Sequence, residues 1–194
     1  MSTEAYEGQI KLKSFPKLGE NKLVSTAYHE AGHALIDLVY GFKVQCVTIV
    51  ANEKDGYIGA YYSRAATRTS NTIEYYTEEA DLISERFGEA YRKVQGKHFI
   101  SGLLAGFIAQ AIYSGVHDFN GARSDFSKIT DWFISEGETV IDNKYLQDRY
   151  DDAAYMLEAN IDLLNKIAGD LYRSKELSAD YFDSLPPLQY YQSM

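Results

Sequence analysis

Two histidines with three residues between them, and a glutamate next to the first, are the residues of this chain best suited to chemistry. They lie in the segment His29-Glu30-Ala31-Gly32-His33. On a helix, residues four apart lie on the same side, one turn from each other, so both imidazoles can bind one metal ion. Glu30 is rotated by about 100° from His29, which places a carboxylate where it can take a proton from a metal-bound water.

The surrounding sequence predicts that this segment is a buried helix. Aliphatic residues recur at helical spacing from Val24 to Leu38, and the two histidines fall on the opposite side, beside Ile36 and Tyr40. Buried histidines need polar partners. The alternative to a metal is that they bond to backbone carbonyls or to Asp37, or lie exposed on a surface helix. The His-Glu-x-x-His spacing is the zincin motif of zinc metallopeptidases and favours the metal.

The composition limits the kinds of partner and site. A chain of 194 residues fits one domain, and a net charge of −9 argues against nucleic acid as a partner. Cys46 is the single cysteine, so we expect neither a disulfide framework nor a cysteine zinc cluster. Residues 1–20 lack the apolar segment of a signal peptide, so a cytoplasmic location is the default expectation.

One uncharged segment, residues 99–116, has two features of a membrane helix. It contains no charged residue, and Gly102 and Gly106 form a GxxxG pair. However, polar residues dilute the segment, and small residues at this spacing equally suit a closely packed buried helix. A membrane span is therefore the less favoured interpretation.

Periodicity and turn residues predict a mainly α chain with a small β-hairpin or sheet, an α+β fold. Asn21 and Gly41 are the expected cap and stop of the helix that carries the histidines. The other expected elements are strands at 44–51 and 57–63, a heptad-like helix at 73–94 ended by Gly96, helices at 98–113 and 124–136, an apolar helical series across 138–173, and a short helix after Ser178.

A catalytic zinc needs three protein ligands and an open position for water. The third ligand of a zincin is distant in sequence, so spacing alone cannot identify it. The candidates are His98, His117, Asp118, Asp125, Asp131 and Glu136.

An ordered set of motifs resembles the peptidase domain of the FtsH-type ATP-dependent zinc metalloproteases. Residues 26–35, TAYHEAGHAL, look like the zinc helix of that family. Residues 47–50 and 56–61, VTIV and GYIGAY, are similar to the strands that follow it. Later segments also match in order: LLAG at 103–106, GARSDF at 121–126, MLEAN at 156–160 and KEL at 175–177. The resemblance covers most of residues 22–185.

The resemblance implies a zincin-like helical peptidase domain at 21–185, with an N-terminal arm at 1–20 and a tail at 186–194. It also implies that Asp125 is the third zinc ligand beside His29 and His33, with Asp118 and His117 as the next candidates. Asp125 could instead be a first-turn acid favoured by the helix dipole. The implied activity is hydrolysis of peptide bonds in unstructured polypeptides, with Zn²⁺ as cofactor and Glu30 as general base.

The chain departs from that family in three ways. It has no Gly-x-x-x-x-Gly-Lys-Ser/Thr loop, so we expect it to bind no ATP and to need a separate ATPase partner for any unfolding of substrates. Phe107 and Gln110 stand where the family has an arginine and an acidic residue. The connection after the Asp125 helix is also short.

Two other hypotheses remain, and these departures motivate the first of them. The first is a weak or inactive zinc-stabilised adaptor of the same fold. The second is a helical interaction module that uses the 73–94 stripe and binds no metal. The stripe permits a homo-oligomer without requiring one.

Overall fold

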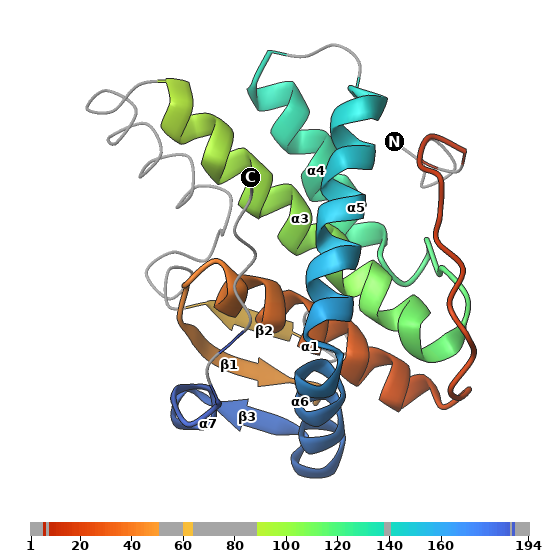
Figure 1. Cartoon of the computed structure of the whole chain (residues 1–194), viewed down its shortest axis with the longest axis vertical. Helices are drawn as coiled ribbons and strands as arrows, with labels where there is room; N and C mark the ends of the chain where they lie inside the picture. Colours follow the sequence, from red (N-terminus) through yellow and green to blue (C-terminus); the bar gives the residue numbers. More distant parts are fainter. Residues whose placement is uncertain are drawn as a thin grey trace.

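The computed structural model describes residues 6, 8–50, 60–63, 89–137, 141–186 and 188. The fold is α+β and mainly helical, as the sequence predicts, with a small sheet toward one end of the molecule (Figure 1). Within these residues the elements follow in the order α1 (Lys22–Val39), β1 (Val44–Thr48), β2 (Ala60–Ser63), α3 (Glu89–Ser114), α4 (Arg123–Ser135), α5 (Asn143–Ala159), α6 (Ile161–Ser174), β3 (Glu176–Ser178) and α7 (Ala179–Asp183).

Helix α1 begins and ends at the residues that the sequence marks for it. The Asn21 side-chain oxygen accepts hydrogen bonds from the backbone N–H groups of Leu23 and Val24, at 3.0 and 3.2 Å. These bonds satisfy donors that the first turn of a helix cannot pair internally. After Tyr40, Gly41 adopts a φ of +82°, which glycine reaches without steric cost, and the chain turns toward β1.

Helices α1 and α3 cross at close range through the core. A Cβ placed on Gly32 would lie 2.5 Å from the Ala105 carbonyl oxygen and 2.7 Å from the Ala109 Cβ. The glycine therefore lets the two backbones approach, and Leu35 and Ile36 are fully buried on the same helix. This contact fixes the position of His33, one residue further along α1, relative to α3.

Helix α3 corrects the expectation that a helix ends at Gly96. The helix runs without interruption from Glu89 to Ser114. Gly96 is instead a packing position, because a Cβ there would lie 2.4 Å from the Trp132 ring of α4. A glycine in a helix can thus mark the close approach of a side chain as well as a helix end. Most of the 73–94 stripe lies outside the described residues.

The sheet has the strand order β2-β1-β3, and both pairings are antiparallel. The pairing of β1 with β2 agrees with the predicted hairpin, although β1 ends at Thr48 rather than at residue 51, and residues 51–59 lie outside the described part. Strand β3 was not predicted. It pairs Leu177 with Val47, and both side chains are buried.

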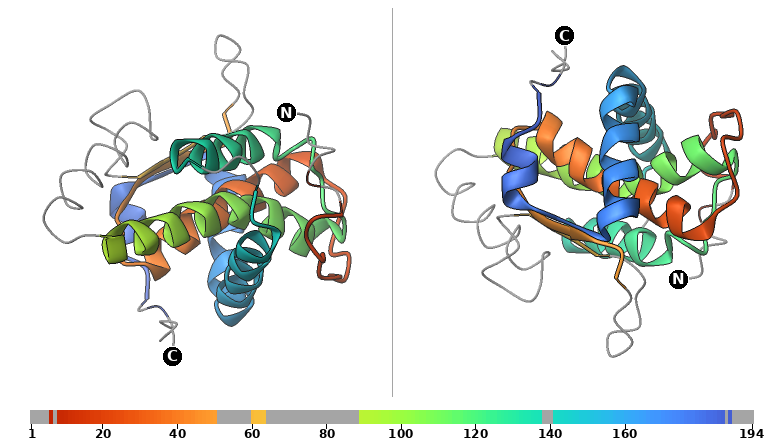
Figure 2. Two further views of the ribbon diagram at one scale, coloured as in Figure 1. Left: turned by 90° about the horizontal axis from the view of Figure 1, so that it is seen from above. Right: turned by 90° about the horizontal axis from the view of Figure 1, so that it is seen from below.

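The helical series expected across 138–173 is two helices rather than one. The break lies at Asn160, whose backbone leaves the helical conformation with φ −118° and ψ 31°. Its side-chain nitrogen donates a 2.9 Å hydrogen bond to the Met156 carbonyl, which the broken helix would otherwise leave without an internal donor. The chain can then turn, and α6 packs across α1 (Figure 2).

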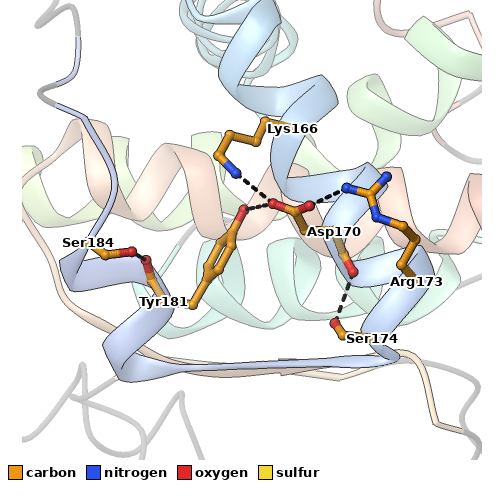
Figure 3. A network of polar contacts seen from close by, with 6 residues as sticks. All are labelled: Lys166, Asp170, Arg173, Ser174, Tyr181 and Ser184. Carbon is orange, nitrogen blue, oxygen red and sulfur yellow. Dashed lines mark hydrogen bonds and ion pairs between the residues drawn. The ribbon is translucent and has the colours of Figure 1, made fainter.

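A polar network around Asp170 ties α6 to α7 (Figure 3). The Asp170 carboxylate accepts hydrogen bonds from Tyr181 and Lys166, both at 2.7 Å, and also pairs with Arg173. These contacts hold the pKa of Asp170 low, at about 2. Because Tyr181 belongs to α7, the network fixes α7 to α6, the helix that packs on α1.

Most of the uncharged segment at 99–116 lies in the second half of α3, which ends at Ser114, whereas Val116 beyond it is exposed. Leu104, Phe107 and Ile108 are almost fully buried in that helix. None of the helices in the described part of the chain has the length and apolar character needed to cross a membrane.

Candidate metal centre

Helix α1 places the two histidines of the motif side by side. Their Nε2 atoms lie 3.1 Å apart, and the rings meet edge to face with centroids 4.7 Å apart. Both side chains are about nine-tenths buried. The four-residue spacing therefore directs two nitrogen donors at one point, as the sequence predicts.

The orientation of His33 is set by the backbone of α3. Its Nδ1–H donates a 2.7 Å hydrogen bond to the carbonyl oxygen of Gly102. This bond fixes the tautomer, so in the neutral ring Nε2 carries the lone pair and faces His29. The sequence allows a backbone carbonyl as a partner of this ring but does not identify Gly102 as the residue that provides it.

Gly106 of α3 leaves the space that the two nitrogens occupy. A Cβ at this position would lie 2.5 Å from Nε2 of His33 and 2.8 Å from Nε2 of His29. Any larger residue would displace the rings. Gly106, which belongs to the GxxxG pair, thus also contacts the metal centre.

Asp125 reaches the histidines from the first turn of α4. Its Oδ2 lies 3.1 Å from Nε2 of His29 and 3.5 Å from Nε2 of His33. The preceding loop is shaped by Asp118, whose Oδ1 accepts hydrogen bonds from the backbone N–H groups of Asn120 and Gly121, both at 3.0 Å. This turn delivers the start of α4 to the site.

The three donor atoms lie close enough together to bind one metal ion. The sides of the triangle that they form are 3.1, 3.1 and 3.5 Å between Nε2 of His29, Nε2 of His33 and Oδ2 of Asp125. Four ligands at about 2.0–2.1 Å around tetrahedral Zn²⁺ are separated from each other by about 3.3 Å. Within the part of the chain that the structure describes, these residues form the group of three that could hold a metal ion. Two imidazoles and a carboxylate leave one position open for water.

The charges of the metal-free site are strongly coupled. Burial alone would lower the pKa of His33, but the nearby Asp125 and Glu30 carboxylates and the Gly102 carbonyl outweigh it and raise this pKa to about 9. Burial alone would raise the pKa of Asp125, but the His33 charge and hydrogen bonds from both histidines hold it well below its ordinary value. The raised pKa of His33 and the lowered pKa of Asp125 both favour the charged forms of these two residues.

Glu30 lies buried beside the donor triangle. Its side chain points from the same turn of α1 as His29, and burial raises its pKa, while the charges of His29, His33 and Lys128 oppose that rise. A carboxylate with a raised pKa accepts a proton more readily than an exposed one. Glu30 is thus a buried carboxylate on the turn of α1 that carries the histidines.

Lys128 is a charged neighbour of the site that is not among the residues predicted from the sequence. Its ammonium group lies 3.7 Å from Oδ1 of Asp125, the oxygen that faces away from the histidines, and its side chain is 40% exposed. The three-residue spacing from Asp125 on one helix was the signal that could have found it. Lys128 adds positive charge beside Asp125.

The other candidate ligands lie elsewhere. Nε2 of His98 contacts Asp37 Oδ1 at 2.7 Å inside the core, stacked on Phe42. His117 contacts the Tyr150 hydroxyl at 2.9 Å, and burial lowers its pKa to about 4. Asp118 is exposed and stabilises the loop before α4.

The two positions that depart from the family pattern have other neighbours. Phe107 lies in an aromatic cluster with Phe119 and Phe126, at centroid distances of 4.8 and 5.1 Å. The Gln110 amide oxygen lies beside Gly121, where an added Cβ would come within 3.3 Å of it. Both side chains thus contact the segment that leads into α4.

Comparison of the sequence with protein-family models and with curated proteins gives no match.

Proposed function

We propose that this protein is a zinc-dependent metalloendopeptidase with a peptidase domain of the FtsH type. The observation that carries the proposal is the donor triangle of His29, His33 and Asp125, which has the dimensions of one face of a zinc tetrahedron. Gly106 supports it, because its missing side chain leaves the histidine nitrogens free to converge. The order of motifs along the chain adds the resemblance to that family.

Zinc held by these residues would acidify a bound water and polarise the carbonyl of the bond to be cleaved. Glu30 would serve as the base that accepts a proton from such a water and as the acid that gives one to the leaving amine. Its carboxylate is buried, next to His29 on the same helix. Lys128 contributes positive charge near Asp125 as negative charge develops on the substrate.

The substrate class follows from the resemblance and from the sheet. An extended peptide would add as a strand to an outer strand of the sheet, which orders its backbone beside α1. Both β2 and β3 are outer strands beside β1 among the described residues, and β2 is the one that packs near α1. The proposal includes no ATP site in this chain, so the substrates are unstructured polypeptides, or proteins unfolded by a separate ATPase.

The competing proposal is a zinc-stabilised adaptor that does not cleave. Gln110 motivates it, because the FtsH-type family has an acidic residue at this position. The amide of Gln110 is neutral and does not supply the negative charge that an acidic side chain would supply.

One comparison separates the two proposals: cleavage of casein by the zinc-loaded wild type, by Glu30→Gln and by Glu136→Gln. Glu136 is exposed at the end of α4, so its variant controls for the loss of a carboxylate. We expect wild-type cleavage with Glu136→Gln, and a loss of at least about 100-fold with Glu30→Gln at unchanged zinc content. Equal activity in wild type and Glu30→Gln would refute the peptidase mechanism. Stoichiometric zinc without cleavage in any variant would favour the adaptor.

A further inference from the structure

We propose that Tyr6 is a positioning residue for the metal centre, which acts by holding α4 so that Asp125 stays in reach of His29 and His33. The inference rests on the metal site of the proposed function and does not depend on peptidase activity.

Tyr6 is joined to the first half of α4 by its ring and its hydroxyl. The hydroxyl donates a 3.1 Å hydrogen bond to the carbonyl of Phe126 and contacts the hydroxyl of Thr130. The ring packs on Phe126 with centroids 4.6 Å apart, and the side chain is only 2% exposed. Phe126 is the neighbour of Asp125 in sequence, so this contact acts within one residue of the proposed ligand.

The first turn of α4, which carries Asp125, makes few contacts with the histidine helix, although the later part of α4 is buried against α3 and α5. The main neighbour of α4 among the described elements is α3, whereas α1, which carries both histidines, is not a main neighbour. Ala122 at its N-cap provides no side-chain hydrogen bond to the first turn. The position of Asp125 relative to the histidines therefore depends on other contacts of α4. The contact with Tyr6 is one of them, and it is buried.

The segment that carries Tyr6 is itself fixed to other helices. The backbone N–H of Lys13 donates to the Tyr150 hydroxyl at 3.0 Å, and the N–H groups of Leu18 and Gly19 donate to the Tyr113 carbonyl at 2.8 and 3.1 Å. This segment, red in Figure 1, runs along one side of the molecule from α4 to the start of α1. It thus connects the helix of the third ligand to α5, to the end of α3 and to the histidine helix.

The simpler view is that Tyr6 only fills the core. In that case removal of its hydroxyl would lower the stability of the whole protein and leave the affinity of the folded protein for zinc unchanged. A positioning role predicts a specific loss of zinc affinity. Residues that orient metal ligands typically change metal affinity by about 10–100-fold when they are altered.

The test measures the zinc dissociation constant by competition with a chelator, in full-length protein, together with the thermal unfolding temperature. Tyr6→Phe removes only the hydroxyl. Tyr181→Phe is the matched control, because it removes a hydroxyl bonded to Asp170 at 2.7 Å in elements that carry no site residue. Thr130→Val removes the other side of the Tyr6 contact and decides the matter if Tyr6→Phe does not fold.

We expect about tenfold weaker zinc binding in Tyr6→Phe and in Thr130→Val, and a change of less than about twofold in Tyr181→Phe, although all three variants melt earlier. Equal zinc affinity in wild type and Tyr6→Phe overturns the inference but leaves the metal site intact. An equal loss in Tyr6→Phe and Tyr181→Phe also overturns it, since the effect is then one of general stability. A wild type that binds no zinc overturns the metal site and the inference together.

Discussion

The α-carbon of Gly106 faces His33 so closely that a Cβ on it would lie 2.5 Å from the Nε2 nitrogen of that ring. We therefore expect Gly106→Ala to weaken zinc binding at least about tenfold, because the methyl group would push both imidazoles out of their positions. The measurement is the zinc dissociation constant of the folded variant.

Gly102→Ala is the control, one turn earlier on the same helix, where an added Cβ meets nothing within 4 Å. Alanine there should leave zinc affinity unchanged and stabilise the fold by about 0.5–1 kcal/mol, since glycine is the poorer helix former. Equal zinc affinity in both variants would show that Gly106 does not bound the metal centre.

Asp118 lies in the loop before α4 and Asp125 lies in the first turn of α4. Asp118 accepts backbone hydrogen bonds within the loop, whereas Asp125 contacts the two histidines. Asp125→Asn should lower zinc affinity by about 100-fold or more, because a carboxylate ligand is replaced by a neutral amide. Asp118→Asn should retain zinc, since its exposed side chain accepts two backbone hydrogen bonds that an asparagine can also accept. Zinc content after dialysis, measured by elemental analysis, separates the two. The reverse result would make Asp118 the third ligand.

Zinc binding should become tighter as the pH rises from about 6.5 to about 9. In the metal-free protein the pKa of His33 is raised from 6.5 to about 9, so in this range a proton must leave before the nitrogen can bind zinc. Calorimetry in buffers of different ionisation enthalpy should detect release of about one proton per zinc near neutral pH. A zinc affinity that is constant over this range would contradict the assignment of His33 as a ligand.

The same shift makes a prediction for the stability of the metal-free protein. A group whose pKa is higher in the folded than in the unfolded state stabilises the fold below its unfolded pKa and loses that effect as the pH passes its folded pKa. His33 should therefore stabilise the metal-free protein fully below about pH 6.5, and this contribution should disappear by about pH 9. Thermal melting of the chelator-treated protein across this range tests it, with the zinc-loaded protein as the control.

Tyr181→Phe should lower the unfolding free energy by about 1 kcal/mol, because the Asp170 carboxylate loses one of its hydrogen-bond donors. The pKa of Asp170 is lowered from 3.8 to about 2 in the fold, so its contribution is present above about pH 4 and is lost toward pH 2. The difference between wild type and variant should accordingly shrink on acidification between these values. Denaturant unfolding at several pH values measures it, and a constant difference would contradict the role of Asp170.

Local signals predicted those parts of the fold that local interactions decide. Asn21 and Gly41 bound α1 because capping and left-handed turns involve only neighbouring residues. The prediction of a helix end at Gly96 was wrong because the role of this glycine depends on Trp132, a residue that sequence patterns do not place beside it. Strand β3 was missed because three residues are too few to show an alternating pattern, and its pairing with β1 is a long-range contact.

The candidate site was predictable to the same extent. The spacing of His29 and His33 is a local property of one helix, and the structure brings their nitrogens together. Asp125 joins them, although spacing could not distinguish it from Asp118 or His117 and only the family resemblance singled it out. The Gly102 carbonyl could not be foreseen, because it depends on how α3 crosses α1.

The donor triangle joins α1 to α4, two helices that are otherwise connected mainly through α3. A bound ion would therefore act as a cross-link between α1 and α4. Its removal should destabilise α4 first. After chelation, amide hydrogens in α4 should exchange with solvent faster, while those of α1 at its crossing with α3 stay protected. Loss of metal would then appear as a local opening of one helix before any global unfolding.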